Sequence, residues 1–249
     1  MTRRSLRSRI RRRAVALERQ LVLGRRPTPP AELGLEKIGS GYGGWIVPTR
    51  WLTADWICYC GGVGEDITFD LGVIERFGCT VFAFDPTPRA VTFVAATAAD
   101  EPRFVFRPVG LWSEDTTLRF FAPRDASHVS HSAVNLQRTD TFFEAEVRSI
   151  PTLMGEFSHD RIDLLKLDIE GAEHRVIRSL LEAGIRPIVI CLEIDQPVRP
   201  WTFWRTVRRI RRAGYTLVAV DHWNLTFALA DVLRAGTRGT PAPPVGAAR

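Results

Sequence analysis

The chain contains 249 residues, of which 45% are hydrophobic and 25% are charged. These values are usual for a soluble globular protein and provide enough apolar residues for a substantial core. Every apolar run is shorter than the roughly 18 residues of a membrane span, so we expect no transmembrane segment. The four cysteines form no C-x-x-C pair, which argues against a zinc site. We expect them to be buried and reduced in the cytoplasm.

Positive charge is concentrated at the N-terminus. Residues 1–26 contain ten arginines and one glutamate, a local charge of +9, so the rest of a chain whose total is +6 carries −3. Apolar residues recur in this segment at roughly helical spacing, which predicts an amphipathic helix. Such a helix could contact an anionic membrane surface weakly or lie solvated beside the body. No other feature of the sequence indicates nucleic-acid binding, and we expect no such partner.

From residue 55 onward, apolar segments of strand length alternate with segments of helical character. The predicted strands are 55–60, 79–84, 103–112, 163–169 and 187–194, and the predicted helices are 65–77, 87–99, 171–184 and 200–214. The apolar runs are short, continuous and rich in β-branched residues, as in parallel strands covered on both faces. This alternation predicts a doubly wound α/β sheet, with a less regular region up to about residue 150.

Two further strands, 216–220 and 225–229, close the pattern. Only four residues separate them, whereas a crossover between parallel strands needs about a dozen, so this pair must be antiparallel. The sequence therefore predicts a seven-stranded, mostly parallel sheet whose last strand is reversed, with helices on both faces. A nicotinamide-binding sheet of the usual Rossmann order does not need this ending.

A glycine loop follows the first predicted strand. Gly61, Gly62 and Gly64 would let the backbone approach a ligand closely, and we expect them to bind a cofactor. The next helix opens with Glu65 and Asp66, whose charges would repel a pyrophosphate and favour a cationic ligand such as S-adenosylmethionine. Stabilisation of the first helical turn is the alternative explanation for this acidic pair.

Asp85 ends the second predicted strand, 21 residues beyond the last glycine of the loop. A carboxylate at about this offset can accept both ribose hydroxyls of an adenosine. The alternative is an aspartate that caps the helix after Pro86. Together with the glycine loop, Asp85 predicts an adenosine site.

A second group of carboxylates follows the fourth predicted strand, where Asp168, Glu170 and Glu173 fall within six residues. The carboxyl ends of the strands form the edge where active sites of such sheets lie. The group could orient and deprotonate an acceptor hydroxyl, or it could hold a divalent cation completed by Asp195. It could also be an ion-pair network without chemistry. We take Asp168 and Glu170 as candidate catalytic residues and assign no metal ligand.

Other ionisable residues near this group also need an explanation. Lys166 lies in the strand interior, where an unpaired ammonium group is unfavourable, so we expect it to meet one of these carboxylates or Glu193. The polar segment 125–137 contains His128 and His131. A histidine can act as a base near neutral pH, so His131 is a third candidate catalytic residue, although a surface loop could contain both for no chemical reason.

The sequence resembles the FkbM family of S-adenosylmethionine-dependent methyltransferases. The similar stretches are GSGYGGW (39–45), YCGGVGEDITFD (59–70), FAFDPTPRAV (82–91) and IDLLKLDIEGAEHRVI (162–177). The resemblance implies a class I methyltransferase (Rossmann-like) fold and methyl transfer to an oxygen, commonly on a sugar or a secondary metabolite. It implies that the three glycines line the methionine part of the cofactor and that Asp85 binds its ribose. It also implies that Asp168 and Glu170 lie near the transferred methyl group.

One position departs from the pattern of such enzymes. Many methyltransferases have an acidic residue late in the first strand, where this sequence has Cys58 or Tyr59. The contact to the amino group of the cofactor would then fall to Glu65 or Asp66.

The domain organisation follows from these assignments. We expect a basic helix and Pro-rich linker at 1–37, a methyltransferase domain at 38–234 and a disordered tail at 235–249. A small-molecule acceptor is the expected partner. Two other functions stay open, a nicotinamide-dependent oxidoreductase and a binding protein that uses its arginine-rich tail to engage a membrane or a partner.

Overall fold

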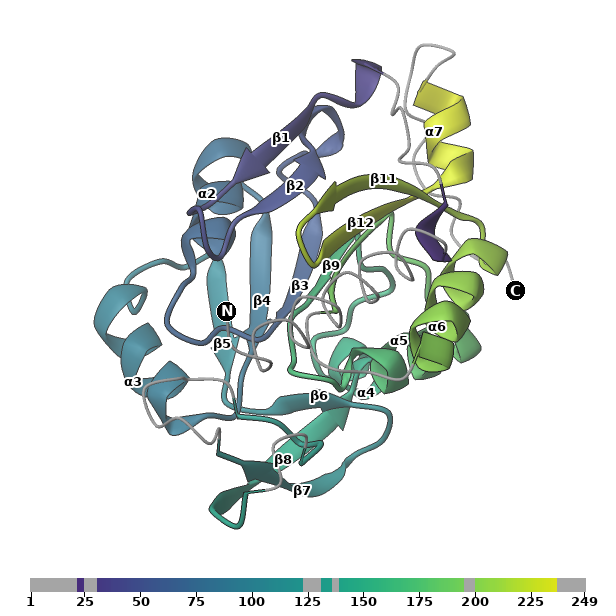
Figure 1. Ribbon diagram of the computed structural model, residues 1–249. Helices are drawn as coiled ribbons and strands as arrows, with labels where there is room; N and C mark the ends of the chain where they lie inside the picture. The colour runs from purple at the N-terminus through teal and green to yellow at the C-terminus, as the bar shows by residue number, and fades with distance from the viewer. Residues whose placement is uncertain (1–21, 25–30, 123–130, 136–138, 195–199, 237–249) are drawn as a thin grey trace, which may run out of the picture.

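The computed structural model describes residues 22–24, 31–122, 131–135, 139–194 and 200–236 (Figure 1). Its centre is a seven-stranded sheet of order β11-β12-β10-β9-β3-β4-β5. The strands of this sheet are β3 (Ile57–Gly61), β4 (Thr80–Phe84), β5 (Phe104–Arg107), β9 (Leu164–Leu167), β10 (Val189–Glu193), β11 (Tyr215–Asp221) and β12 (Asn224–Leu229). Neighbouring strands from β10 to β5 pair in parallel, whereas β12 is antiparallel to both β10 and β11. The predicted seven-stranded sheet with one reversed strand is therefore confirmed.

Helices cover both faces of the sheet, as predicted. They are α2 (Thr68–Phe77), α3 (Pro88–Thr97), α4 (Ile150–Glu156), α5 (Glu173–Glu182), α6 (Pro200–Arg212) and α7 (Ala230–Gly236). Side chains of β3 alternate between two buried clusters. Cys58 and Cys60 pack with α2 and α3, while Tyr59 packs on the other face with α4, α5 and α6. Because successive strand residues point to opposite faces, a continuous apolar run fills both cores.

The predicted strand 103–112 is wrong in its extent. It breaks at Pro108, where the Val109 N–H donates to the Arg107 carbonyl, and its second half forms β6 (Gly110–Trp112). This strand leaves the main sheet for a three-stranded sheet with β7 (Thr116–Phe121) and β8 (Phe142–Ser149), in the order β6-β8-β7. Much of the region that the sequence left irregular is therefore regular. Its strands were missed because one face of β7 and β8 is exposed and carries charged residues.

The segment before the sheet forms an antiparallel hairpin of β1 (Leu35–Ile38) and β2 (Trp45–Pro48), flanked by the 3-10 turns η1 (Ala31–Leu33) and η2 (Thr49–Trp51). The predicted linker boundary at residue 37 falls inside β1. Residues 22 and 23 lie against α6, where Arg211 donates to both of their carbonyl oxygens. The remainder of the predicted basic helix, residues 1–21, and nearly all of the predicted tail lie outside the described residues. None of the described helices combines the length and apolarity required to span a membrane.

Candidate cofactor and acceptor site

The two acidic groups predicted from the sequence meet at one edge of the sheet. Gly61, the last residue of β3, is in register with Phe84 of β4 and with Leu167 of β9. The glycine loop, Asp85 and Asp168 therefore follow directly from three adjacent parallel strands. This is the carboxyl edge, where ligands bind in doubly wound sheets.

The glycine loop is shaped by close approach to the segment after β9. Gly62 has a φ of +81°, and a Cβ added to it would lie 1.8 Å from the carbonyl oxygen of Asp168. The Asp168 N–H donates to the Gly61 carbonyl at 3.1 Å, which fixes the two segments together. Gly64 also has a positive φ, but a Cβ there would meet nothing within 4 Å. Gly62 is thus needed for backbone packing, while Gly64 borders open space.

Asp85 organises this loop. Its Oδ2 accepts hydrogen bonds from the N–H groups of Val63 (2.9 Å) and Gly64 (3.0 Å), and its Oδ1 accepts from the N–H (2.8 Å) and hydroxyl (2.6 Å) of Thr87. These four bonds match the roughly four lone-pair positions of a carboxylate. A further donor could bind Asp85 only by replacing one of them. The Thr87 hydroxyl can be exchanged without leaving a backbone N–H unpaired.

Lys166 supports the same loop from inside the sheet. It is buried, and its Nζ donates to the Gly62 carbonyl at 2.7 Å. Burial alone would lower the pKa of this ammonium group, but the nearby Asp70 and Asp168 carboxylates outweigh it and raise the pKa. Of the expected partners, Asp168 and Glu193 therefore act on Lys166 through their charge, whereas Asp70 was not expected. The hydrogen bond of Lys166 goes to the glycine loop.

Glu173 builds the turn that carries the other acidic residues. Its buried carboxylate accepts from the N–H groups of Ile169 (2.8 Å) and Gly171 (2.9 Å). Burial raises the pKa of Glu173 to about 8, although these backbone hydrogen bonds favour the ionised form. Glu170 lies within the turn with a φ of +54°, a strained conformation for a residue with a side chain. Glu173 is thus a structural member of the predicted acidic group.

The segment that contains His131 lies beside this turn. The hydroxyl of Ser132 donates to the Glu170 carbonyl at 2.5 Å and so ties the two segments together. The ring of His131 packs edge-on against Phe143, with 5.3 Å between ring centroids. The structure therefore brings the backbone at His131 next to the turn of Glu170. His128 and Asp195 lie outside the described residues.

Glu65 and Asp66 both have partners within the chain. Glu65 forms an exposed ion pair with Arg89 at 2.7 Å. Asp66 accepts hydrogen bonds from the hydroxyl of Ser40 (2.6 Å) and the N–H of Thr68 (2.9 Å), and thereby links the loop of the β1–β2 hairpin to the start of α2. Partial burial would raise the pKa of Asp66, but the hydrogen bonds from Ser40 and Thr68 lower it. The predicted helix start at residue 65 is displaced to Thr68 because residues 63–66 form this turn.

Sequence reasoning did not find the small polar residues that fix these loops. Ser40, Thr87 and Ser132 each bind an acidic residue of the edge or its backbone. A partial signal existed for Thr87, since it follows Asp85 by two residues and precedes a proline at the start of a helix. For Ser40 and Ser132 the partners are distant in the sequence, so no local pattern indicates them.

The edge fits a cationic adenosyl cofactor. Gly62 and Gly64 have positive φ angles and carry no side chain that could cover the loop, and the space beside Gly64 is open. Asp66 remains ionised, since its pKa is lowered. No group of three or more His, Cys, Asp or Glu side chains in the described ranges is arranged to hold a metal ion.

The strand order, with one antiparallel strand inserted between β10 and β11, defines a class I methyltransferase fold. The family profile described as "Methyltransferase FkbM domain" matches residues 63–217, more than half of the chain. The chain therefore belongs to the FkbM methyltransferase family, and the matched region is an S-adenosylmethionine-dependent methyltransferase domain.

Two curated relatives cover about half of the chain. Probable methyltransferase-like protein 24 of Rattus norvegicus is 28% identical over 123 residues, and its Homo sapiens counterpart is 27% identical over 124 residues. These alignments include 49% of this chain but only 28% and 27% of the relatives, so the chain spans little more than a quarter of their length.

Among solved structures, the chain resembles Aeropyrum pernix fibrillarin, which was determined in complex with S-adenosyl-L-methionine. The TM-score is 0.42 at 11% identity, covering 84% of this chain and 86% of that one. A similarity of this size adds nothing to the assignment, which rests on the sheet order and the family match.

Proposed function

We propose that the protein transfers a methyl group from S-adenosylmethionine to a hydroxyl oxygen of a small acceptor, a sugar or a secondary metabolite. The observation that carries this proposal is the meeting of the glycine loop, Asp85 and Asp168 at one edge of the sheet. Bound there, the cofactor would supply a methyl group made electrophilic by its sulfonium charge. The carboxylates at this edge suit that charge, whereas the pyrophosphate of a nicotinamide cofactor would be repelled.

The cofactor contacts that we propose follow from the geometry of the loop. Gly61, Gly62 and Gly64 would line the methionine part, and Asp85 would bind the ribose by exchanging its bond from the Thr87 hydroxyl. The amino group of the cofactor would be balanced mainly by Asp66 because the charge of Glu65 is compensated by Arg89. Glu65 would then act on this amino group only through longer-range electrostatic attraction.

The acceptor would lie beside the turn after β9. We propose that Asp168 removes the hydroxyl proton and that Glu170 orients the hydroxyl, with His131 as the other candidate base. A positioned base of this kind contributes roughly 10²–10⁴-fold to the rate. Holding the acceptor oxygen in line with the methyl group would supply most of the remaining acceleration. The hydrogen bonds of Glu173 keep this turn in place.

The test separates binding from turnover. In Asp168→Ala we expect the affinity for S-adenosylhomocysteine to stay within about twofold, while methyl transfer falls by at least about 100-fold. Radiolabelled S-adenosylmethionine with a panel of hydroxylated acceptors measures the second quantity. Asp100→Ala, which removes an exposed carboxylate after α3, is the matched control and should change neither. Normal turnover in Asp168→Ala would refute its role as base.

The location and partners of the protein belong to the same proposal. All four cysteines are unpaired and buried, as expected in a reducing cytoplasm. We propose a cytoplasmic enzyme whose N-terminal arginine-rich segment contacts anionic membrane surfaces weakly, without a nucleic-acid partner. Deleting residues 1–21 should lower sedimentation with anionic vesicles and leave cofactor binding unchanged.

A further inference from the structure

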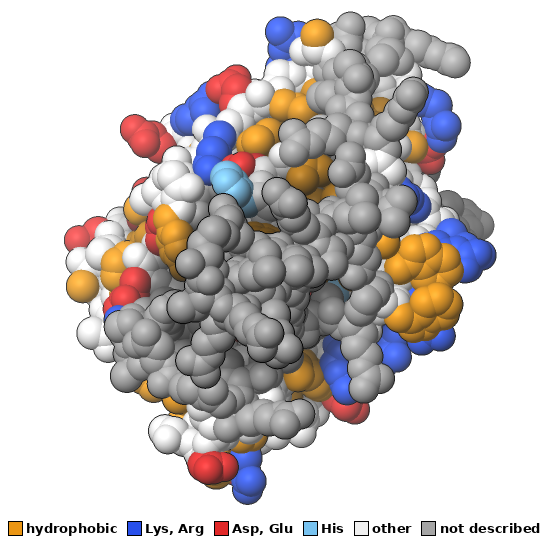
Figure 2. Space-filling view, in the orientation of Figure 1, with side chains coloured by type: hydrophobic (Ala, Val, Ile, Leu, Met, Phe, Trp, Pro, Cys, Tyr) orange, Lys and Arg blue, Asp and Glu red, His pale blue; other side chains and the backbone are white. Residues whose placement is uncertain are grey.

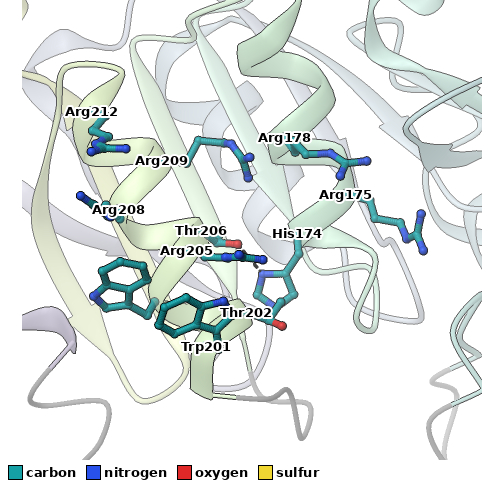
Figure 3. A pocket seen from close by; sticks show the side chains of 11 residues that line it. His174, Arg175, Arg178, Trp201, Thr202, Arg205, Thr206, Arg208, Arg209 and Arg212 are labelled. Atoms are coloured by element: carbon teal, nitrogen blue, oxygen red, sulfur yellow. Dashed lines mark hydrogen bonds between the residues drawn. The ribbon is translucent and has the colours of Figure 1, made fainter.

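A cavity of about 780 Å³ lies between α5 and α6 (Figure 3), and none of its lining residues belongs to the glycine loop. Six arginines line it, two from α5 and four from α6: Arg175, Arg178, Arg205, Arg208, Arg209 and Arg212. We call this cavity the arginine groove. Its α5 wall begins at His174, directly after the Glu173 that holds the acidic turn. In Figure 2, apolar side chains bordered by blue cationic ones gather over α6 at the right of the molecule.

The cationic charge of the arginine groove is compensated only in part. Glu182 lies 4.0 Å from Arg178 and 3.8 Å from Arg209, and it is the one carboxylate paired with the lining arginines in the part of the chain that is described. Among the described residues, six positive charges therefore face one negative charge. Like charges gathered in this way repel one another, and a multivalent anion between them would remove that repulsion.

Aromatic rings hold several of these arginines in place. Trp201 and Trp204 stack with 4.9 Å between ring centroids, and the guanidinium groups of Arg205 and Arg208 lie 5.1 Å and 4.8 Å from the respective ring centroids. Stacking on a ring restrains the guanidinium plane and leaves its N–H edge available to a ligand. Restraint before binding lowers the entropic penalty of ordering these side chains around a ligand.

His174 adds an uncharged donor to the wall of the groove. Its ring points from α5 toward α6, where the Thr206 hydroxyl lies 2.8 Å from Nδ1 (Figure 3). Its Nε2 is buried without a hydrogen-bond partner among the described residues. Burial lowers the pKa of His174 to about 4, so the ring is neutral at pH 7. When Thr206 donates to Nδ1, the proton stays on Nε2, which then needs an acceptor.

We propose that the arginine groove is a second binding site, for a ligand that bears a phosphate or diphosphate group. Arg205 and Arg209 would hold its oxygens from α6, and the His174 Nε2–H would donate to it from α5 once the ligand displaces the atoms that now cover Nε2. Phosphate fits this site better than a single carboxylate because it carries up to two charges and several oxygens that match the arginine fork. The proposal concerns a site outside the methyl-transfer edge and does not depend on the proposed reaction.

The first test is calorimetric titration of the full-length protein with inorganic pyrophosphate at about 0.15 M ionic strength. We expect saturable binding with one site per chain, weakened at least tenfold in Arg205→Gln/Arg209→Gln. The control Arg103→Gln/Arg119→Gln removes the same charge beside β5 and in β7, and it should bind pyrophosphate like the wild type. Unchanged S-adenosylhomocysteine binding in both double variants would show that the fold is intact.

Titration of the imidazole provides a readout that does not depend on the arginine variants. By NMR, pyrophosphate should raise the pKa of His174, because an anion at Nε2 stabilises the imidazolium form. The proposal would be overturned if the wild type showed no saturable binding, if the pKa of His174 did not change, or if binding were weakened equally in both double variants. Equal weakening would mark non-specific attraction to any polyanion, nucleic acid included.

Sedimentation with vesicles distinguishes the two sources of phosphate. Vesicles of phosphatidylcholine with phosphatidic acid should sediment more of the wild type than of Arg205→Gln/Arg209→Gln if the natural ligand is a lipid head group, because the N-terminal arginine-rich segment is the same in both proteins. If pyrophosphate binds in the groove but the two proteins sediment equally with the vesicles, the ligand is a soluble phosphate ester. Both results support the site.

Discussion

The carboxyl edge of the sheet and the arginine groove meet at the start of α5 but use charge in opposite ways. At the edge, Asp85 and Glu173 bind backbone N–H groups and hold loops in place. In the groove, Arg205 and Arg208 lie over tryptophan rings, and within the described residues neither guanidinium group hydrogen-bonds to a loop. A carboxylate near a ligand site can therefore stabilise the loops of the protein through hydrogen bonds with backbone N–H groups. Variants at the edge of the sheet test this difference.

Gly62→Ala should have the largest effect because it forces a Cβ against a backbone carbonyl 1.8 Å away at a φ of +81°. We expect a loss of about 4 kcal/mol or more in unfolding free energy, measured by chemical denaturation. Gly64→Ala is the control, since it has a similar φ but open space around the added Cβ. It should lose only about 1–2 kcal/mol. Equal losses would show that the contact of Gly62 with Asp168 is absent.

Asp85→Ala removes the acceptor of two loop N–H groups and two donors of Thr87. Each buried donor left unpaired destabilises by about 1–3 kcal/mol, so the loop should loosen and S-adenosylhomocysteine should bind at least tenfold more weakly. Asp85→Asn keeps one carbonyl oxygen to face the loop and should lose less stability. Calorimetry and thermal unfolding of both variants measure this. Unchanged affinity in Asp85→Ala would contradict a role at the cofactor site.

Glu173 predicts a pH dependence of stability. Its folded pKa of about 8 lies above the ordinary value of 4.5, so between these values the folded chain holds a proton that the unfolded chain has lost. Stability from this group is therefore complete below about pH 4.5 and declines as pH rises to about 8. At about 1.4 kcal/mol per pKa unit, the decline is a few kcal/mol.

Glu173→Gln isolates this effect because the amide does not titrate and keeps one acceptor for the turn. The difference in unfolding free energy, wild type minus variant, should fall between pH 4.5 and 8 and stay level above pH 8. Urea denaturation across this range measures it. A difference that rises with pH would mean that the backbone hydrogen bonds prevail over burial.

Glu65→Gln should have the smallest effect. An exposed ion pair such as that of Glu65 with Arg89 contributes about 0–1 kcal/mol, so stability should hardly change. Cofactor affinity should fall by less than about threefold if Glu65 acts only through its field. A tenfold loss of affinity with unchanged stability would instead make Glu65 a direct ligand of the cofactor.

The sequence predicted the main sheet well because its signals are local. The buried strands are continuous apolar runs, and the short turn after β11 allows only an antiparallel pair. The prediction failed for residues 103–112, because the second half of this predicted strand forms β6 and belongs to the three-stranded sheet. Nothing within RFVFRPVGLW shows that residues after Pro108 pair with Val147 and its neighbours, nearly 40 residues later.

For the candidate site, the sequence predicted which acidic residues share one edge of the sheet but not all of their bonds. Asp85 and Asp168 were expected at one edge because each follows a parallel strand, and they lie there. The partners of Lys166 and Asp66 were not predictable, since a carbonyl of the glycine loop and the hydroxyl of Ser40 come close only after folding. The arginine groove was missed for a similar reason. Its arginines come from two helices, α5 and α6, which form one groove only after folding.

We propose that the edge formed by the glycine loop and Asp85 accepts a cationic adenosyl donor. Calorimetric titration of the folded protein with S-adenosylmethionine and, separately, with NADH tests it most directly. We predict saturable heat with S-adenosylmethionine and none with NADH. Heat with NADH and none with S-adenosylmethionine would contradict the account.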